Sequence, residues 1–466
     1  MSDIKKNSVV TIDVTAVSNL GYGVGRTEEG KVVFTHGAVS GERAEVKIIK
    51  ITKGYLVGRL MKVLTPSPLR ETCDKCTAPA SCGGCAYRFI KYSHELELKR
   101  QNVRSELDKA GLSHVEVLET ANTGEIWGYR NKAQYRFAAY EGGIRAGFYA
   151  SGTHRVTGDE SCPLQPEIFG KIAKFVCDFA YKKGISVYDE ESGKGLLRHL
   201  YLRTGAGENG EILVCIVIAG KSLPYADELA DALMRTFSRI VGVVLNVNTK
   251  NSNVILGNEY ITVAGKASIR DVFCGVELDV APAAFYQVNH DAAELLCRTA
   301  ADMAGLRGDE HLLDLYCGIG SVGLSMAGRV GRLTGVEIVP EAVECAVANA
   351  ARAGIENARF LCADSALGAS ELLGVAGELP DVVVLDPPRK GCAAELLDTL
   401  DSAGVGKIVY ISCNPATLAR DLAHLHQLGW SIGSVLPVDL FPRTGHVESV
   451  VCLTRRLDNE LRERMN

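Results

Sequence analysis

Residues 314–323 have the sequence Asp-Leu-Tyr-Cys-Gly-Ile-Gly-Ser-Val-Gly, which predicts the end of a β-strand, a glycine turn and the start of a helix. Glycines in such a turn let the backbone approach a bound ligand closely. Glu337 lies nineteen residues after Gly318, at the end of the next predicted strand, where a carboxylate can bind ribose hydroxyls. The spacing Gly318-x-Gly320-x-x-Gly323 fits a nicotinamide dinucleotide site and an S-adenosylmethionine site equally well.

From residue 289 onward the chain alternates regularly between predicted helices and strands. Such alternation is typical of a parallel sheet connected by crossover helices. We expect a helix at residues 291–304 and strands at 312–316, 333–337, 359–362, 382–385 and 407–412, followed by an antiparallel pair near 431–436 and 448–453. Ligands bind beyond the carboxyl ends of the strands in such sheets, so the residues that follow each strand are the candidates for a site.

Two acidic residues after the later strands favour S-adenosylmethionine over a dinucleotide. Asp364 follows the third predicted strand, where its carboxylate can hydrogen-bond to an adenine edge. Asp386 follows the fourth strand and begins the run Asp-Pro-Pro-Arg, for which a nicotinamide oxidoreductase has no evident use. In methyltransferases an acidic residue before a rigid proline pair lies beside the methyl donor and the target base. A proline turn that merely ends the strand is the simpler alternative.

One cysteine and one glutamate in this region suit the methylation of a weakly nucleophilic carbon. Carbon 5 of uracil can attack a sulfonium methyl group only after a thiolate has added to carbon 6, and a base must then remove the carbon 5 proton. Cys413 follows the fifth predicted strand and precedes a helix, whose N-terminal amides we expect to lower the pKa of its thiol. Glu448 opens the last predicted strand. A buried core thiol is the alternative for Cys413, because the chain has 15 cysteines.

The N-terminal part of the chain has short alternating stretches interrupted by glycines. Predicted strands at residues 11–17, 21–26, 31–34, 42–51 and 55–63 suggest a small closed barrel of the OB type, which commonly binds single-stranded nucleic acid. Residues 1–150 contain 22 Lys and Arg against 16 Asp and Glu, a net charge of +6, whereas the remainder contains 29 against 40, a net charge of −11. This excess suits a phosphate-binding surface, although chance surface composition explains it too.

Between the barrel and the parallel sheet, the pattern mixes strands and helices. A cysteine-dense stretch at residues 73–85 precedes a predicted helix at 92–110, and residues 126–280 indicate an α+β domain with a glycine hairpin at 141–144. The N-terminus lacks a signal peptide, and the longest apolar run, at 212–220, is far shorter than a membrane span. We therefore expect a cytoplasmic protein without membrane contact, whose thiols are reduced.

Taken together, these motifs resemble the RNA (uracil-5-)methyltransferase family, in particular its 23S ribosomal RNA branch with a TRAM domain and an iron–sulfur cluster. The resemblance spans the whole chain and rests on motifs at residues 21–24, 82–85, 129–132, 285–289, 314–323, 385–389, 412–421 and 446–448. It implies an α/β fold class with a C-terminal Rossmann-like class I methyltransferase domain at residues 285–466. An N-terminal OB-like TRAM barrel at 1–65 and an α+β central domain at 66–284 are expected before it.

The resemblance also implies roles for individual residues. The family's nucleophile falls on Cys413 and its proton-abstracting base on Glu448, and Phe285 lies where the family stacks on a flipped target base. The family's S-adenosylmethionine contacts fall on Gln287, Tyr316, Ser321, Glu337, Asp364 and Asp386. Arg130 and Lys132 match an RNA-facing segment, for which solvated surface charge is the alternative. Gly445 departs from the pattern, because relatives often have a second histidine there.

The cysteine-dense stretch corresponds to the family's [4Fe–4S] ligands. Cys76, Cys82, Cys85 and the distant Cys162 match the four ligand positions, and thiolates bind such clusters. Cys73 is surplus to this pattern. The pairs Cys73-x2-Cys76 and Cys82-x2-Cys85 offer a zinc site as the alternative.

The chain is therefore expected to transfer a methyl group from S-adenosylmethionine to carbon 5 of a uridine in RNA, with 23S ribosomal RNA as the expected substrate and a monomer as the expected state. A uridine in the T-loop of transfer RNA is an alternative substrate. A non-catalytic protein that binds ribosomal RNA during ribosome assembly, keeping the barrel and the cluster, is the alternative from another functional class.

Overall fold

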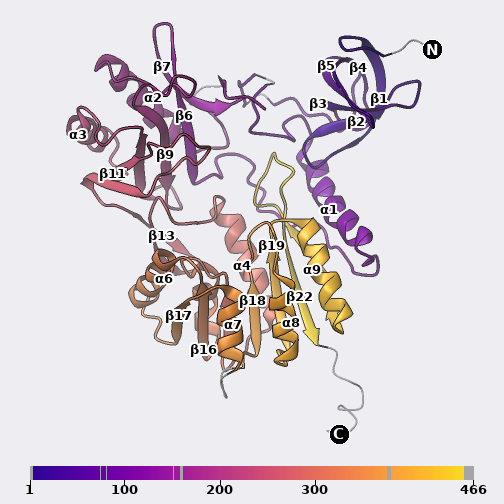
Figure 1. Ribbon diagram of the computed structural model, residues 1–466, viewed down its shortest axis with the longest axis vertical. Coiled ribbons are helices and arrows are strands. Elements are labelled where there is room, and N and C mark those ends of the chain that lie inside the picture. Colours follow the sequence, from indigo (N-terminus) through magenta and orange to yellow (C-terminus); the bar gives the residue numbers. More distant parts are fainter. Residues whose placement is uncertain are drawn as a thin grey trace.

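The structure, a computed structural model, describes residues 4–73, 75–79, 81–150, 152–157, 161–374 and 379–455. A five-stranded barrel, a mixed central sheet and a helix-covered sheet follow one another along the chain (Figure 1). The barrel and the central sheet lie above the third sheet in this view, at the right and the left. No helix among the described residues is long and apolar enough to cross a membrane.

The N-terminal strands close into the expected barrel, in the order β1-β2-β3-β5-β4. Alternate residues of each strand point inward, so that Ile12, Val14 and Val46 are buried in its core. A side chain at Gly58 would place its Cβ 2.0 Å from Val46, so closure of the barrel requires glycine there. The strands are β1 (Val9–Val17), β2 (Tyr22–Arg26), β3 (Val32–His36), β4 (Arg43–Ile51) and β5 (Leu56–Thr65).

The central part has a seven-stranded sheet in the order β12-β11-β10-β9-β6-β7-β8. Helices α2 (Glu167–Lys182) and α3 (Ala226–Thr236) pack on one of its faces. The predicted glycine hairpin is confirmed, since Tyr140 pairs with Gly143 across a two-residue turn. The strands are β6 (Lys132–Tyr140), β7 (Gly143–Tyr149), β8 (Val156–Thr157), β9 (Leu197–Thr204), β10 (Ile212–Ile218), β11 (Ile240–Val247) and β12 (Glu259–Gly265), and a separate pair β13 (Ile269–Phe273) and β14 (Val276–Val280) follows.

The C-terminal sheet has the order β17-β16-β15-β18-β19-β22-β20, with β21 paired to β22. The first five are parallel as predicted, whereas the expected single strand near 431–436 is wrong: β20 and β21 pair separately with β22. The strands are β15 (His311–Leu315), β16 (Arg332–Glu337), β17 (Ala358–Cys362), β18 (Val382–Leu385), β19 (Lys407–Ser412), β20 (Trp430–Ile432), β21 (Leu436–Val438) and β22 (Glu448–Arg455).

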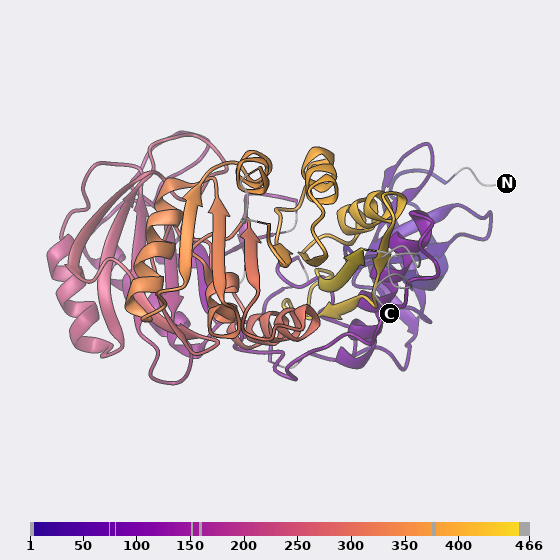
Figure 2. The same ribbon diagram turned by 90° about the horizontal axis from the view of Figure 1, so that it is seen from below.

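Helices cover both faces of this sheet (Figure 2). Neighbouring residues of β15 alternate between the two cores, Leu312 on the side of α4 and Leu313 on the side of α8 and α9. The helices are α1 (Tyr92–Lys109), α4 (His290–Ala304), α5 (Ser321–Met326), α6 (Pro340–Arg352), α7 (Ser365–Leu373), α8 (Ala394–Ser402) and α9 (Pro415–Gln427), and a short 3-10 helix spans Ala327–Arg329. The strand order reverses between β15 and β18, which places a ligand crevice at their carboxyl ends.

Candidate active site

The residues that follow β15 and β18 line a common cavity at the point where the strand order reverses. Tyr316 and Ser321 come from the glycine turn, Asp386 follows β18, and Gln287 and Phe285 come from the segment before α4. Tyr316 has φ +68°, a left-handed conformation that costs energy for a residue with a side chain. Four of the six predicted S-adenosylmethionine contacts, Gln287, Tyr316, Ser321 and Asp386, therefore meet in one place.

The glycine turn is held by two carboxylates. Gly318 donates its backbone N–H to Glu337 Oε2 at 3.0 Å, and Gly323 donates to Asp314 Oδ2 at 2.8 Å. A Cβ on Gly323 would lie 2.7 Å from that same Asp314 oxygen, so only glycine fits there. Burial raises the pKa of Asp314 to about 7. The sequence pattern places Asp314 in the strand before the turn but does not indicate its hydrogen bond to the turn.

The other two predicted contacts lie beside this cavity, outside its lining. Glu337 holds the turn, while Asp364 caps α7 by accepting the N–H groups of Ala366 and Leu367 at 3.0 and 3.4 Å. Burial of the Tyr316 side chain raises the pKa of its phenol, and the nearby Cys392 and Asp364 raise it further. Helix capping alone is a sufficient structural reason for an aspartate at position 364.

Cys413, Glu448, Asp386 and Arg389 converge beyond the carboxyl ends of β18 and β19. Cys413 comes directly after β19 and Glu448 is the first residue of β22, the neighbouring antiparallel strand. Burial, followed by the negative charges of Glu448 and Asp386, raises the pKa of the Cys413 thiol to about 11. The expectation that the helix N-terminus lowers this pKa is therefore wrong: α9 begins at Pro415, and burial of the thiol together with two nearby carboxylates raises the pKa instead.

The two acidic groups beside the thiol are themselves perturbed. Glu448 is 4% exposed, and burial together with Asp386 raises its pKa to about 8, whereas burial raises that of Asp386 to about 7. A carboxyl group with a pKa near neutrality can accept and return a proton, which is the requirement for a general base. The arrangement therefore combines a nucleophile and a base that could act on one ring.

Arg389 is a member of this group that the predicted site lacked. Its guanidinium counteracts the carboxylates, lowering the pKa values of both Cys413 and Glu448. The backbone oxygen of Arg389 accepts a hydrogen bond from Asn414 Nδ2 at 2.9 Å. This bond connects the Asp-Pro-Pro-Arg turn to the start of α9. The sequence signal was present in the Asp-Pro-Pro-Arg run, but the charge balance around the thiol was not visible there.

The three residues predicted to face RNA differ in exposure. Phe285 is 73% exposed at the mouth of the cavity, as a stacking platform requires. Arg130 and Lys132 are half-buried. Arg130 lies against the cysteine segment, where burial raises the pKa of Cys85 to about 12 and that of Cys162 to about 11, and the guanidinium of Arg130 opposes this rise.

The four predicted cluster ligands, Cys76, Cys82, Cys85 and Cys162, line one cavity of about 80 Å³ together with Arg88 and Arg130. Cys73 is not among the lining residues. In the described part of the chain, no three Cys, His, Asp or Glu side chains are grouped closely enough to hold a metal ion. The donor set nevertheless fits a thiolate-bound group in kind and number, because four thiols and no carboxylate are found among the described residues that line the cavity.

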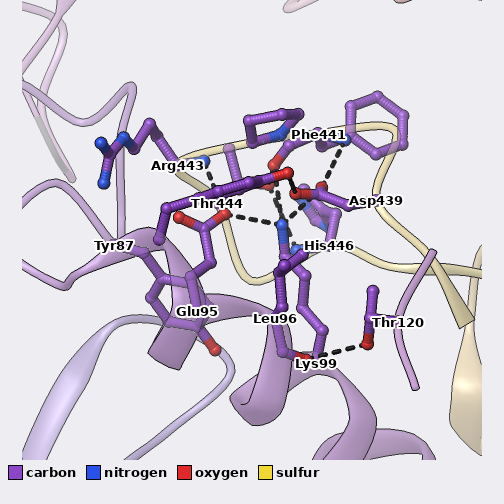
Figure 3. Close-up of polar contacts among 12 residues, drawn as sticks. Tyr87, Glu95, Leu96, Lys99, Thr120, Asp439, Phe441, Arg443, Thr444 and His446 are labelled. Carbon is purple, nitrogen blue, oxygen red and sulfur yellow. Dashed lines mark hydrogen bonds and ion pairs between the residues drawn. The ribbon is translucent and has the colours of Figure 1, made fainter. Parts of the chain in front are cut away.

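A buried polar network holds the segment between β21 and β22 that leads to Glu448 (Figure 3). Arg443 donates its N–H to Glu95 Oε1 at 2.7 Å and its guanidinium to Glu71 at 3.0 Å. Tyr129 donates its hydroxyl to the Pro442 carbonyl at 3.0 Å. The segment is therefore bound by Glu71, which precedes the cysteine-dense stretch, by Glu95 of α1 and by Tyr129, which precedes the central sheet.

Gly445 lies in this same segment, directly against the barrel. A Cβ at this position would lie 1.7 Å from the backbone oxygen of Asn19 in the loop after β1. A second histidine in place of Gly445 therefore cannot be accommodated unless the barrel loop moves. The departure noted in the sequence has a structural reason, the close approach of two backbones.

Comparison with known proteins identifies families for two parts of the chain. Residues 91–456 match the family model described as tRNA (Uracil-5-)-methyltransferase, and residues 4–61 match the TRAM domain model. An RNA methyltransferase of uncharacterised specificity from Clostridium tetani is 38% identical over 451 residues, 97% of both chains. A similar protein from Bacillus cereus is 38% identical over 457 residues, covering 97% of this chain and 98% of its own.

One solved structure is similar over nearly the whole length. The tRNA (uracil-54, C5)-methyltransferase of Pyrococcus abyssi, in complex with S-adenosyl-L-homocysteine, superposes with a TM-score of 0.76 at 26% sequence identity. The match covers 96% of this chain and 99% of that one. The barrel, the central sheet and the C-terminal sheet thus recur together in that structure.

Proposed function

We propose that the chain, which belongs to the tRNA (uracil-5-)-methyltransferase family, acts through a covalent adduct of Cys413. It is an S-adenosylmethionine-dependent RNA (uracil-5-)methyltransferase with an N-terminal TRAM domain. The observation that supports this proposal is the convergence of Cys413, Glu448 and Asp386 beside the cavity at the strand switch point. One nucleophile, one base and one ligand cavity are what the reaction requires.

The proposed reaction begins when Cys413 Sγ, as the thiolate, adds to carbon 6 of the uracil ring. The electron pair of the carbon 5–carbon 6 double bond then becomes available at carbon 5, which forms a bond to the methyl carbon of S-adenosylmethionine as the bond from that carbon to sulfur breaks and its electron pair stays on sulfur. Glu448 removes the remaining carbon 5 proton, and the pair from that bond restores the double bond as the carbon 6–sulfur bond breaks. Methylated RNA, S-adenosylhomocysteine and the free thiolate are the products, and the carbon 5 proton is left on Glu448.

The local charges suggest how the thiol is ionised. Its pKa of about 11 reflects burial and two carboxylates, so neutralising a carboxylate favours the thiolate. Glu448, with a pKa raised to about 8, can take up a proton at neutral pH, and Arg389 stabilises negative charge at both groups. Arg389 is therefore proposed as the residue that supports the anionic states of the site.

S-adenosylmethionine supplies the methyl group and a positively charged sulfur when it is bound. We propose that Gln287, Tyr316, Ser321 and Asp386 bind it in the shared cavity, while Glu337 and Asp364 approach its ribose and adenine from the rim. The carboxyl ends of β16 and β17 place those two acids next to the turn, which supports this assignment.

We propose that the RNA is held by all three parts of the chain, which we divide at the expected boundaries into residues 1–65, 66–284 and 285–466. The exposed Phe285 ring would stack on the flipped target uracil, and Arg130 and Lys132 would contact the RNA backbone near it. The TRAM barrel would bind a more distant part of the RNA.

The proposed substrate is a uridine of 23S ribosomal RNA. The cysteine segment and the TRAM barrel support this choice, because they resemble those of the 23S ribosomal RNA branch of the family. A uridine of transfer RNA is the second candidate, because the Pyrococcus abyssi structure that matches 96% of this chain is named a tRNA (uracil-54, C5)-methyltransferase. Mapping 5-methyluridine in both RNA classes, from cells with and without this gene, distinguishes the two substrates.

We propose that Cys76, Cys82, Cys85 and Cys162 hold a [4Fe–4S] cluster, since they line one cavity together with two arginines. Protein prepared without oxygen should then contain about four iron atoms per chain and absorb light at about 400 nm. Cys76→Ser should remove the iron, whereas Cys73→Ser should not. A colourless protein that contains zinc would contradict the cluster.

The proposed activity is tested with purified protein, S-adenosylmethionine and transcripts of 23S ribosomal RNA and transfer RNA. The expected product is 5-methyluridine at one or a few positions, lost in Cys413→Ala and in Glu448→Gln. Wild-type protein that binds either RNA but never methylates it would favour the non-catalytic alternative.

A further inference from the structure

The face of the central sheet opposite α2 and α3 is cationic. Along β6, Ala133, Tyr135 and Phe137 pack into the core with these helices, so Lys132, Gln134 and Arg136 point to the other face. On the neighbouring strand β9, Arg203 lies opposite Lys132 and His199 lies opposite Arg136. Like charges directly opposite each other destabilise a sheet, so the Lys132–Arg203 pair is unfavourable unless an anion lies near it.

Several of these side chains line one cavity of about 240 Å³, here called the sheet-face cavity. It is distinct from the cysteine cavity, although Arg130, Phe148 and Gln165 line both. The described residues that line it include no Asp or Glu.

Two lining side chains lack protein partners for their polar atoms. His199 is only 5% exposed, yet its Nδ1 atom is buried without a hydrogen-bond partner. Burial and the nearby Arg136 and Arg198 lower the pKa of His199 to about 3, so the ring is neutral and can donate from Nδ1. A buried polar atom without a partner is costly, so a ligand oxygen that accepts a hydrogen bond from Nδ1 would stabilise this site.

Lys132 is the second such side chain. Its ammonium forms no hydrogen bond or ion pair with any described residue, and burial with Arg203 and Arg130 lowers its pKa to about 8. Arg136, in contrast, is fixed in place, because its guanidinium donates to the carbonyls of Arg198 and Tyr188, both at 2.8 Å, and lies 3.5 Å from Glu190 Oε1 in an ion pair. The cavity therefore presents one free cation, Lys132, beside a rigidly held cation that is paired with Glu190.

The sheet-face cavity lies next to the active site. Asn131 donates its backbone N–H to the Val288 carbonyl and its side chain to the Gln287 carbonyl, both at 2.8 Å. Val288 lines the sheet-face cavity, whereas Gln287 and Phe285 line the cavity at the strand switch point. One short segment thus separates the proposed methyl-donor and target-base site from the sheet-face cavity.

We propose that the sheet-face cavity is a phosphate subsite that binds a phosphodiester of the RNA close to the flipped-out target nucleotide, through Lys132 and His199 beside Arg136. This inference rests on the proposed function. A phosphodiester supplies the negative charge that offsets Lys132 and Arg203 and an oxygen acceptor for His199 Nδ1. The subsite would fix the register of the RNA backbone while Phe285 holds the base.

The test compares Lys132→Gln, Lys132→Arg and the matched control Lys221→Gln, which changes an exposed lysine of the same sheet region. For Lys132→Gln we expect the KM for RNA to rise about tenfold and the slope of log KM against log salt concentration to fall by about 1. The kcat at saturating RNA should stay within about twofold, Lys132→Arg should restore the KM, and Lys221→Gln should match the wild type.

A stability measurement separates this role from a structural one. Because Lys132 faces Arg203 and Arg130, its removal should leave the Tm of the RNA-free protein equal to or above that of the wild type. Inorganic phosphate should compete with RNA for the wild-type protein and compete less well for Lys132→Gln. Competition with an unchanged salt slope would assign the cavity to free phosphate and overturn the RNA subsite.

The inference fails if Lys132→Gln and Lys221→Gln change the KM and the salt slope equally, or if Lys132→Gln lowers the Tm and Lys132→Arg does not restore the KM. In either case methylation at saturating RNA would continue, so the proposed function would stand. A wild-type protein without any methylation of RNA would instead contradict the proposed function itself.

Discussion

Lys99 of α1 and Asp439, 340 residues later in the chain, form an ion pair of 2.6 Å between two side chains that are completely buried. The same ammonium also binds Glu95 at 2.7 Å and the Phe441 carbonyl at 3.1 Å (Figure 3). Asp439 begins the segment that ends at Glu448, so the position of the proposed base depends on a buried cluster of charges on another helix.

Replacing Lys99 by Met should therefore be strongly destabilising, because it leaves two buried carboxylates without their cation. We expect a loss of about 3–5 kcal/mol in the free energy of unfolding, measured by urea denaturation, and a fall in kcat in the fraction that remains folded. The control is Lys109→Met, whose 2.6 Å pair with Glu106 is exposed and should contribute less than about 0.5 kcal/mol. Equal stability of the two variants would show that the buried pair does not hold the segment.

Replacing Cys413 by Ser should lower kcat by at least about a thousandfold, because a hydroxyl group is a far weaker nucleophile than a thiolate. Affinities for RNA and adenosylhomocysteine should change little, as the replacement is nearly isosteric. Cys345→Ser, on the outer helix α6, serves as the matched control and should methylate normally. Retention of activity in Cys413→Ser would assign the nucleophile to another residue.

The rate of methylation should rise with pH between about 6 and 9. Below a pKa of about 8 the Glu448 carboxyl is mostly protonated and cannot act as a base, and the Cys413 thiol, with a pKa of about 11, is mostly protonated throughout this range. Both ionisations therefore increase the rate as the pH rises. Single-turnover rates at saturating RNA and methyl donor measure this, and a rate independent of pH would be inconsistent with the charges described.

Replacing Arg389 by Gln should shift that pH profile to higher pH. The guanidinium lowers the pKa values of Cys413 and Glu448, so its loss makes both groups harder to ionise. We expect a rate at pH 7 about tenfold lower than that of the wild type, recovering in part at pH 9. A uniform loss at every pH would indicate that Arg389 binds substrate and leaves the two pKa values unchanged.

Replacing Gly445 by Ala should separate the barrel loop from the active-site segment, since the added Cβ would lie 1.7 Å from the Asn19 oxygen. A destabilisation of about 1–3 kcal/mol is expected from this overlap. Gly406→Ala is the control, because no atom lies within 4 Å of its added Cβ. Thermal unfolding of both variants measures the difference, and a Gly445→Ala protein as stable as the control would mean that the two backbones separate freely.

Much of the fold was predictable because its strands are regular. The five parallel strands are mainly apolar runs, and the barrel strands are short alternating stretches bounded by turn residues, so each was predicted within about two residues of its observed ends. The single strand expected near 431–436 failed because Gly433 interrupts the pattern and β20 and β21 pair with β22 at different places. A local pattern does not record which partner a short strand chooses.

The site was predictable in its members more than in its electrostatics. Cys413, Glu448 and Asp386 were identified because each follows or opens a strand at the same sheet edge. The raised pKa of Cys413 could not be foreseen, because it depends on carboxylates 27 and 35 residues away in the chain that burial brings close. For the same reason the sequence showed neither the Lys99–Asp439 pair nor the unpartnered His199.

The most direct test of the covalent mechanism uses RNA in which 5-fluorouridine replaces uridine. Fluorine cannot be removed from carbon 5 as a cation, so the adduct persists after methyl transfer. With S-adenosylmethionine present, we predict a protein–RNA conjugate whose link maps to Cys413 by mass spectrometry and which is absent for Cys413→Ala. An enzyme that methylates ordinary RNA but forms no such conjugate, or forms one through another residue, would contradict the account.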